Sequence, residues 1–288
     1  MTETAETLRR KINSAGELQS VVRTMKALAA SGLTQYERAV HSLDDYYRTV
    51  ELGLVACLSQ PDVVMAGVGR SSLNRGVTGA VVFGSDQGLV GQFNEVLTEF
   101  AMGRLKAMSG NKRIMAVGER VLGYLPEAVM TGNVPNSIAA ITQLVGRILQ
   151  DIDTQHERGE VAEVYLFHNR PRSGSLYEPV MQRLLPLDET WRHQLTKLPW
   201  PTANLPEVIN ATTEQTLIRE YLFISLFRAC AESMASENAS RLAAMQRAEK
   251  NIEEQLADLN QDFNQLRQSG IDEELFDVIA GFEALSVR

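Results

Sequence analysis

The chain has 288 residues, of which 44% are hydrophobic and 6% aromatic, and it carries a formal net charge of −8. This length allows one large or two ordinary domains with a buried core, while the negative charge argues against nucleic-acid binding, which relies on basic surfaces. No apolar run approaches the roughly 18 residues of a membrane span, and the first residues do not resemble a signal peptide. We therefore expect a cytoplasmic protein with reduced cysteines and without direct membrane insertion.

The first predicted element is one long helix over residues 1–58, a stretch without proline. Its apolar residues recur every three or four positions, which places them on one face of a helix. A helix of about 50 residues would be roughly 75 Å long, and such a length favours a coiled coil. The expected stripe is Ala15, Leu18, Val22, Met25, Ala29, Gly32, Tyr36, Val40, Leu43, Tyr47, Val50, Leu54 and Cys57.

Residues 75–190 alternate between short apolar strands and helices, which predicts a central Rossmann-like α/β domain with a largely parallel sheet. We expect the flanking stretches 60–74 and 188–210 to be irregular joints. The expected strands are 77–84, 113–117, 127–131, 163–167 and 180–187, and the expected helices are 93–108 and 137–155.

A second long helix is predicted over residues 212–288, which also lack proline. An antiparallel coiled coil with residues 1–58 is the simplest way to bury both apolar stripes. In that register Cys57 and Cys230 are far apart, so we expect both to be unpaired. Basic residues such as Arg23 and Lys26 would lie near Glu249 and Glu253, although two separately solvated faces remain an alternative.

The second helix is longer by some 20 residues, so about 30 Å of it should extend beyond the pair. This segment still carries apolar residues that have no partner left in the chain, and an apolar tip of this kind implies a socket in another protein. The tip residues are Ile271, Leu275, Ile279 and Phe282.

Residues 84–91 form a glycine-rich segment between a predicted strand and a predicted helix, where phosphate groups often bind. The glycine spacing matches neither of the nucleotide-binding motifs G-x-G-x-x-G and G-x-x-x-x-G-K-[ST], and no lysine follows to bind a phosphate. We therefore interpret the segment as a tight turn with Asp86 near the helix start. The four histidines are not at metal-ligand spacing. We expect no catalytic, cofactor-binding or metal-binding residues.

Four segments resemble, in order, motifs of the gamma subunits of F-type ATP synthases. They are Met-Lys-Ala-Leu-Ala-Ala-Ser at 25–31, Gly-Ser-Asp-Gln-Gly-Leu-Val-Gly-Gln-Phe-Asn at 84–94, Ser-Glu-Asn-Ala-Ser-Arg-Leu-Ala-Ala-Met at 236–245 and Phe-Asn-Gln-Leu-Arg-Gln at 263–268. The resemblance implies an antiparallel coiled coil with an α/β domain at its foot. It also implies a non-catalytic rotor subunit of the central stalk, which couples ion-driven rotation to conformational cycling of the catalytic beta subunits during ATP synthesis or hydrolysis.

The implied partners are a ring of three alpha and three beta subunits, the epsilon subunit and the membrane c-ring. The chain would then be peripheral, on the cytoplasmic face of the cell inner membrane. By position in the motifs, the residues implied in coupling to beta are Met25, Lys26, Arg241, Arg267 and Gln268. The sequence departs from the family at residues 32–35, where basic residues are usual, and at Asp272, where threonine is common. These departures suggest a divergent branch of the F-type ATPases.

Two other functions are compatible with parts of the sequence. A dinucleotide-binding enzyme with helical extensions would use the 84–91 segment, but its glycines lack the required spacing. A coiled-coil scaffold would explain the long helices but gives no reason for the apolar tip or for four ordered motifs.

Overall fold

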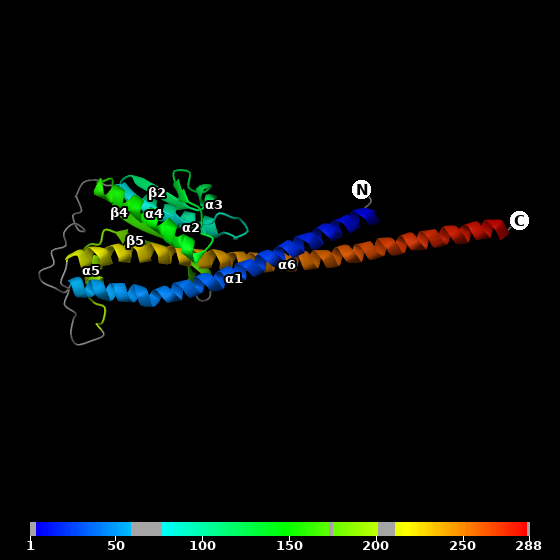
Figure 1. Cartoon of the computed structure of the whole chain (residues 1–288). Coiled ribbons are helices and arrows are strands. Elements are labelled where there is room, and N and C mark those ends of the chain that lie inside the picture. Colours follow the sequence, from blue (N-terminus) through cyan, green and yellow to red (C-terminus); the bar gives the residue numbers. More distant parts are fainter. Residues whose placement is uncertain (1–3, 59–76, 173–174, 201–210, 287–288) are drawn as a thin grey trace. The chain divides into compact units, whose positions relative to one another are not determined.

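The computed structural model describes residues 4–58, 77–172, 175–200 and 211–286. Two long helices, α1 (Ala5–Leu58) and α6 (Ala211–Ser286), precede and follow a set of strands and shorter helices in the chain (Figure 1). Neither contains a proline, so their backbone hydrogen bonding is uninterrupted. The contacts divide the chain into two compact units, residues 1–29 with 242–288 and residues 30–241, and each unit includes part of both helices.

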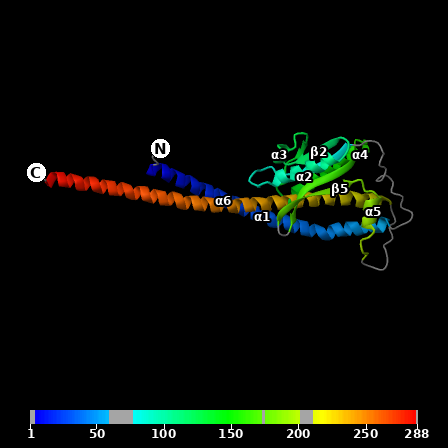
Figure 2. The same ribbon diagram turned by 180° about the vertical axis from the view of Figure 1, so that it is seen from behind.

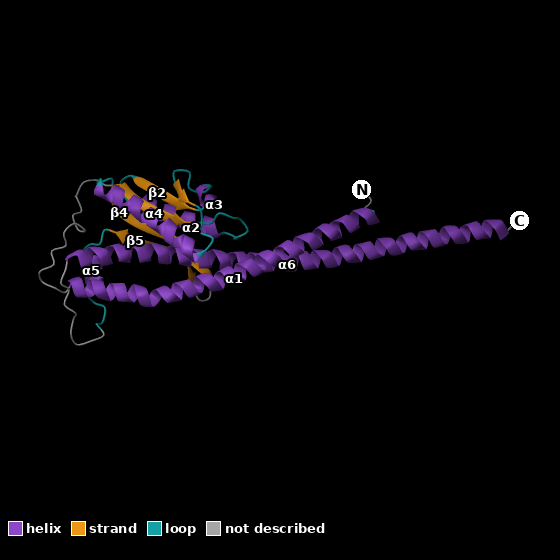
Figure 3. Cartoon of the chain, viewed as in Figure 1, coloured by secondary structure: helices purple, strands orange, loops and turns teal. Residues whose placement is uncertain are grey.

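The unit of residues 30–241 contains one five-stranded sheet in the order β3-β2-β1-β4-β5. Its strands are drawn in orange in Figure 3. Strands β1, β2, β3 and β4 all run in the same direction, and β5 runs antiparallel to β4. The strands are β1 (Val77–Phe83), β2 (Lys112–Val117), β3 (Val129–Gly132), β4 (Val161–Arg172) and β5 (Ser175–Leu185). Helices α2 (Phe93–Ala107) and α4 (Ile138–Glu157) connect parallel strands. The predicted α/β architecture with a largely parallel sheet is thus confirmed.

Alternate side chains of β1 enter two separate cores, as the period of a strand requires. Ala80 and Val82 pack with α2, whereas Val81 and Phe83 belong to the core that contains α4 and parts of α1 and α6. The sheet therefore lies between two helical layers. In this unit Cys57 and Cys230 are both buried and free, as expected.

In the unit of residues 1–29 and 242–288, the two helices run antiparallel. Arg23 contacts Glu249, while Gln19, one turn earlier, contacts Glu253. In this register the first residues of α1 lie opposite about residue 267, and both views show α6 continuing past them (Figures 1 and 2). The predicted antiparallel coiled coil and its overhang are both present.

The prediction is wrong for one residue of the apolar stripe on α1, which does not face α6. Leu18 is 58% exposed, and Gln19 faces α6 in its place. Both residues follow Ala15 at a helical spacing of three or four, so the pattern alone does not distinguish them.

Two short helices are missing from the sequence prediction, α3 (Glu119–Leu122) and α5 (Glu189–Leu195). Helix α5 occupies part of the stretch expected to be an irregular joint, and the Asp188 side chain caps it by accepting from the amide of Trp191. The other expected joint, 60–74, lies outside the described residues, as do residues 201–210.

Candidate functional site

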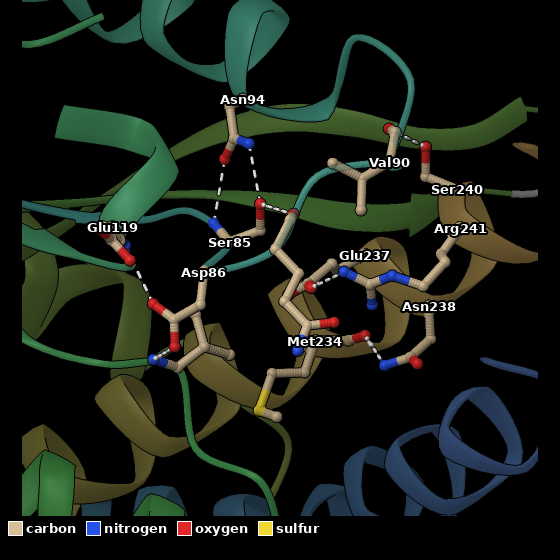
Figure 4. Close-up of polar contacts among 12 residues, drawn as sticks. Ser85, Asp86, Val90, Asn94, Glu119, Met234, Glu237, Asn238, Ser240 and Arg241 are labelled. Atoms are coloured by element: carbon tan, nitrogen blue, oxygen red, sulfur yellow. Dashed lines mark hydrogen bonds and ion pairs between the residues drawn. The ribbon is translucent and has the colours of Figure 1, made fainter. Parts of the chain in front are cut away.

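Two of the family-like segments, 84–94 and 236–245, meet within the unit of residues 30–241 (Figure 4). The serines of α6 donate to backbone carbonyls of the sheet and of the loop after β1. The Oγ–O distances are 2.9 Å from Ser233 to Phe83, 3.0 Å from Ser236 to Asn169, and 2.5 Å from Ser240 to Val90. All three serines are at most 3% exposed. Helix α6 is therefore attached to the sheet by directional polar bonds as well as by apolar packing.

The loop after β1 is held by its own polar contacts. The amide of Ser85 donates to Asn94 Oδ1 at 3.0 Å, and Asn94 Nδ2 donates to Ser85 Oγ at 2.8 Å. The carboxylate of Asp86 accepts from the amides of Glu119 and Val134 at 2.9 and 2.8 Å. Asp86 thus ties the loop after β1 to the start of α3 and to the loop after β3.

Arg241, one of the predicted coupling residues, lies at the end of this cluster. Its Nη2 contacts Glu237 Oε1 at 2.6 Å, and the two side chains are 12% and 8% exposed. Burial raises the pKa of Glu237, an effect that Arg241 partly offsets. The guanidinium Nε has no partner among the described residues.

A second buried polar group was not predicted from the sequence. His168 Nε2 lies 2.8 Å from Glu232 Oε2, and both side chains are nearly inaccessible. Glu232 also accepts from Arg228, which contacts Asp44 at 3.2 Å. Strand β4, helix α6 and helix α1 are linked in this way. The sequence signal was weak, because His168 and Glu232 are 64 residues apart and neither belongs to a ligand motif.

Met25 and Lys26 belong to the unit of residues 1–29 and 242–288. Met25 is half-buried, and the ammonium of Lys26 binds Glu249, which also accepts from Arg23. Hydrogen bonds from Lys26 and Arg23 lower the pKa of Glu249. The predicted charge pairing between the helices is therefore present at these residues.

Arg267 and Gln268 are exposed on α6 in the same unit, as is every residue from 271 to 280. The predicted tip residues Ile271, Leu275, Ile279 and Phe282 are 57%, 56%, 45% and 74% exposed. Phe276 and Val278 add to this surface at 69% and 70%. An apolar surface of this extent, on a segment of α6 that extends past the described residues of α1, is typical of a binding surface.

The same unit exposes apolar side chains on α1. Leu18, Val21 and Leu28 are 58%, 56% and 68% exposed. Spacings of three and seven residues place them on one side of the helix. The paired part of the coiled coil therefore also has an apolar surface open to a partner.

No group of three or more His, Cys, Asp or Glu side chains among the described residues could hold a metal ion. In the described part of the chain, no helix combines the length and apolarity needed to span a membrane.

Comparisons with known proteins agree over almost the whole chain. A family model described as ATP synthase matches residues 4–285. A relative named ATP synthase gamma chain, from Polaromonas naphthalenivorans, is 27% identical over 290 residues, covering 96% of this chain and 98% of the relative. Another of the same name, from Desulfitobacterium hafniense, is 26% identical and covers 98% and 99%.

Solved structures support the fold. A chain of the OSCP/F1/c-ring part of the Euglena gracilis mitochondrial ATP synthase superposes with a TM-score of 0.68 at 16% identity, covering 98% of this chain and 94% of that chain. A chain from the rotor of the same complex gives a TM-score of 0.64 at 15% identity, covering 93% and 98%. At these identities the structural likeness establishes the fold alone.

Proposed function

This chain belongs to the ATP synthase family, and from that premise we propose that it couples ion-driven rotation of a membrane ring to catalysis in the complex. It is a gamma-type subunit of the central stalk, in line with its relatives named ATP synthase gamma chain. The chain itself is non-catalytic, so the chemistry of ATP belongs to other subunits.

The observation that carries the proposal is the exposed apolar end of α6. Fully covering a large apolar side chain contributes about 1.5–3 kcal/mol, and six such side chains lie open between Ile271 and Phe282. A sleeve formed by a ring of larger subunits would cover them on all sides. The exposed Leu18, Val21 and Leu28 would face the inside of the same ring.

We assign the partners as a ring of three alpha and three beta subunits around the coiled coil, with the epsilon subunit and the membrane c-ring at the α/β domain. The chain then lies at the cytoplasmic face of the cell inner membrane as a peripheral protein. Met25, Lys26, Arg267 and Gln268 would contact beta, since all four are at least partly exposed. Arg241 is mostly buried against Glu237, so its part would be indirect.

An asymmetric shaft can control three chemically identical sites. Each beta subunit would meet a different face of the coiled coil, and the face that it meets would favour one of its conformations by differential contact. Rotation would exchange these faces in turn, so that binding and release of nucleotide alternate among the sites. The coupling is reciprocal in equilibrium terms, because nucleotide binding must then also favour particular orientations of the shaft.

Native mass spectrometry of the complex isolated through a tag on this chain tests the proposal. We expect one copy of this chain together with three copies of each of two larger subunits. A complex of any other ratio, such as a symmetric homodimer, would instead favour a coiled-coil scaffold.

A further inference from the structure

The serines of α6 that bind the sheet form one continuous face. Ser233, Ser236 and Ser240 follow one another at spacings of three and four, which aligns them along one side of the helix. Their acceptors lie at the end of β1 (Phe83), in β4 (Asn169) and in the loop after β1 (Val90). We call these three serines the serine face.

Strand β4, which accepts the hydrogen bond from Ser236, is also held in place by polar contacts. The Asn169 side chain, fully buried, donates to the carbonyl of Phe93 at the start of α2 at 3.0 Å, so the strand that accepts from Ser236 is itself held to a helix. One turn before Ser236, Glu232 binds His168 of β4 at 2.8 Å. Polar ties of α6 to the sheet therefore extend over more than two turns of the helix.

The hydrogen bonds of the serine face resist movements of α6 that apolar packing allows. Apolar contacts are non-directional, so a helix can slide or turn slightly against a core while still burying its surface. A hydrogen bond weakens steeply when its angle or length changes. Bonds from one helix face to three separate segments therefore resist rotation of the helix about its own axis.

We propose that the serine face is the torque-bearing junction of this chain, the place where turning of the α/β domain is passed to α6. The inference rests on the proposed rotor function. Helix α6 continues without a break from these serines to Ser286, so a twist applied at Ser233, Ser236 and Ser240 enters the coiled-coil segment through the helix backbone. The serines act as positioning residues.

The test uses the assembled complex with the triple variant S233A/S236A/S240A. Alanine fits the space of serine and favours helix, so only the hydroxyl bonds are lost. We expect amide hydrogen exchange in residues 84–91 to accelerate by about fivefold, the effect of losing one ordinary hydrogen bond, because the Ser240–Val90 bond ends in this segment. We also expect a lower stall torque in single-molecule rotation, with the unloaded rotation rate unchanged. Ser42→Ala is the matched control, because the hydroxyl of Ser42 donates to the carbonyl of Arg38 in its own helix.

The single variants Ser233→Ala and Ser240→Ala cover the case that the triple variant does not assemble, and each should show a smaller loss of stall torque. Wild-type stall torque in these variants would overturn the inference, even if hydrogen exchange became faster. That result would leave the rotor function intact. If the unmodified complex shows no rotation of this chain, the proposed function fails first and the inference fails with it.

Discussion

Glu232 and Glu237 lie little more than one turn apart on α6, yet the pKa values of their carboxyl groups shift in opposite directions. Burial alone raises both values. At Glu232, His168 and Arg228 outweigh burial and hold the pKa below its ordinary value of 4.5. At Glu237, Arg241 does not outweigh it, and the pKa stays raised. The two carboxyl groups therefore differ in whether their hydrogen-bonding and charged neighbours outweigh the effect of burial on the pKa.

The variant Glu232→Gln tests this at the acid end of the pH range. A lowered pKa in the folded state adds stability above the unfolded value near 4.5, and this stability is lost as the pH falls through the folded value. We expect the variant to be about 1–3 kcal/mol less stable than wild type at pH 7, with the difference shrinking below about pH 4.5. Urea unfolding of both proteins at several pH values measures this difference in stability.

Glu178→Gln is the matched control, since Glu178 pairs with Arg172 at the surface and should change stability by less than about 1 kcal/mol. A stability difference between Glu232→Gln and wild type that stayed constant from pH 7 to pH 3.5 would contradict the account.

Met25→Lys addresses the coupling site. The substitution adds a cation to a half-buried position beside Lys26, on a surface assigned to contact with beta. We expect the complex to hydrolyse ATP but to pump fewer ions per ATP, measured by vesicle acidification against phosphate release. Ser42→Lys adds the same charge at an exposed position of α1 outside the proposed contact and should leave the ratio unchanged. An unchanged ratio in Met25→Lys would remove this residue from the site.

Among the elements, those with a clear period were predictable. Strand β1 and helices α2 and α4 begin and end within about two residues of their predicted bounds, because apolar spacing marks them directly. Helices α3 and α5, of 4 and 7 residues, are too short to show a period. Strand β4 is longer than predicted, since polar residues such as His168 and Arg170 follow its apolar part while the ladder with β5 continues.

The ties between elements were harder to predict. A serine on a helix has the same appearance in the sequence whether it faces solvent or a carbonyl, and a carbonyl acceptor carries no residue identity. The serine face could not be derived for this reason, although Ser236 and Ser240 belong to one of the family-like motifs. The exposed tip was predictable, because it follows from the difference in length between two uninterrupted helices.

Gly84 tests the packing at the end of β1. A Cβ at this position would lie 2.5 Å from Val121 Cβ and 3.0 Å from Asn94 Oδ1, so α3 or the loop must shift. We expect Gly84→Ala to lower the free energy of unfolding by about 1–3 kcal/mol. Gly146, inside α4, has open space around its Cβ position, and Gly146→Ala should instead raise stability by about 0.5–1 kcal/mol. Chemical unfolding followed by circular dichroism compares them, and equal effects would contradict the packing described here.

At the scale of the molecule, we expect changes to the exposed end of α6 to affect assembly of the complex but not folding of the chain. Replacing Ile271, Leu275, Ile279 and Phe282 with serine alters only exposed side chains, so the isolated chain should keep its thermal midpoint within a few degrees. In the complex we expect reduced assembly or torque, measured by native mass spectrometry and single-molecule rotation.

Deleting residues 267–288 should have the same two effects. The double variant E273A/E274A removes exposed charges from the same segment and should assemble normally. Global unfolding of the truncated chain would show that this end stabilises its own fold, contrary to its exposure.

The apolar end also has a consequence for biosynthesis. A newly made copy outside the proposed ring presents six large apolar side chains to water, and two such copies can cover them by joining end to end. Supply of this chain in excess of the larger subunits should therefore produce aggregates, whereas balanced co-production should keep it dispersed. Rapid binding to the proposed ring would prevent this aggregation and would also complete assembly of the complex.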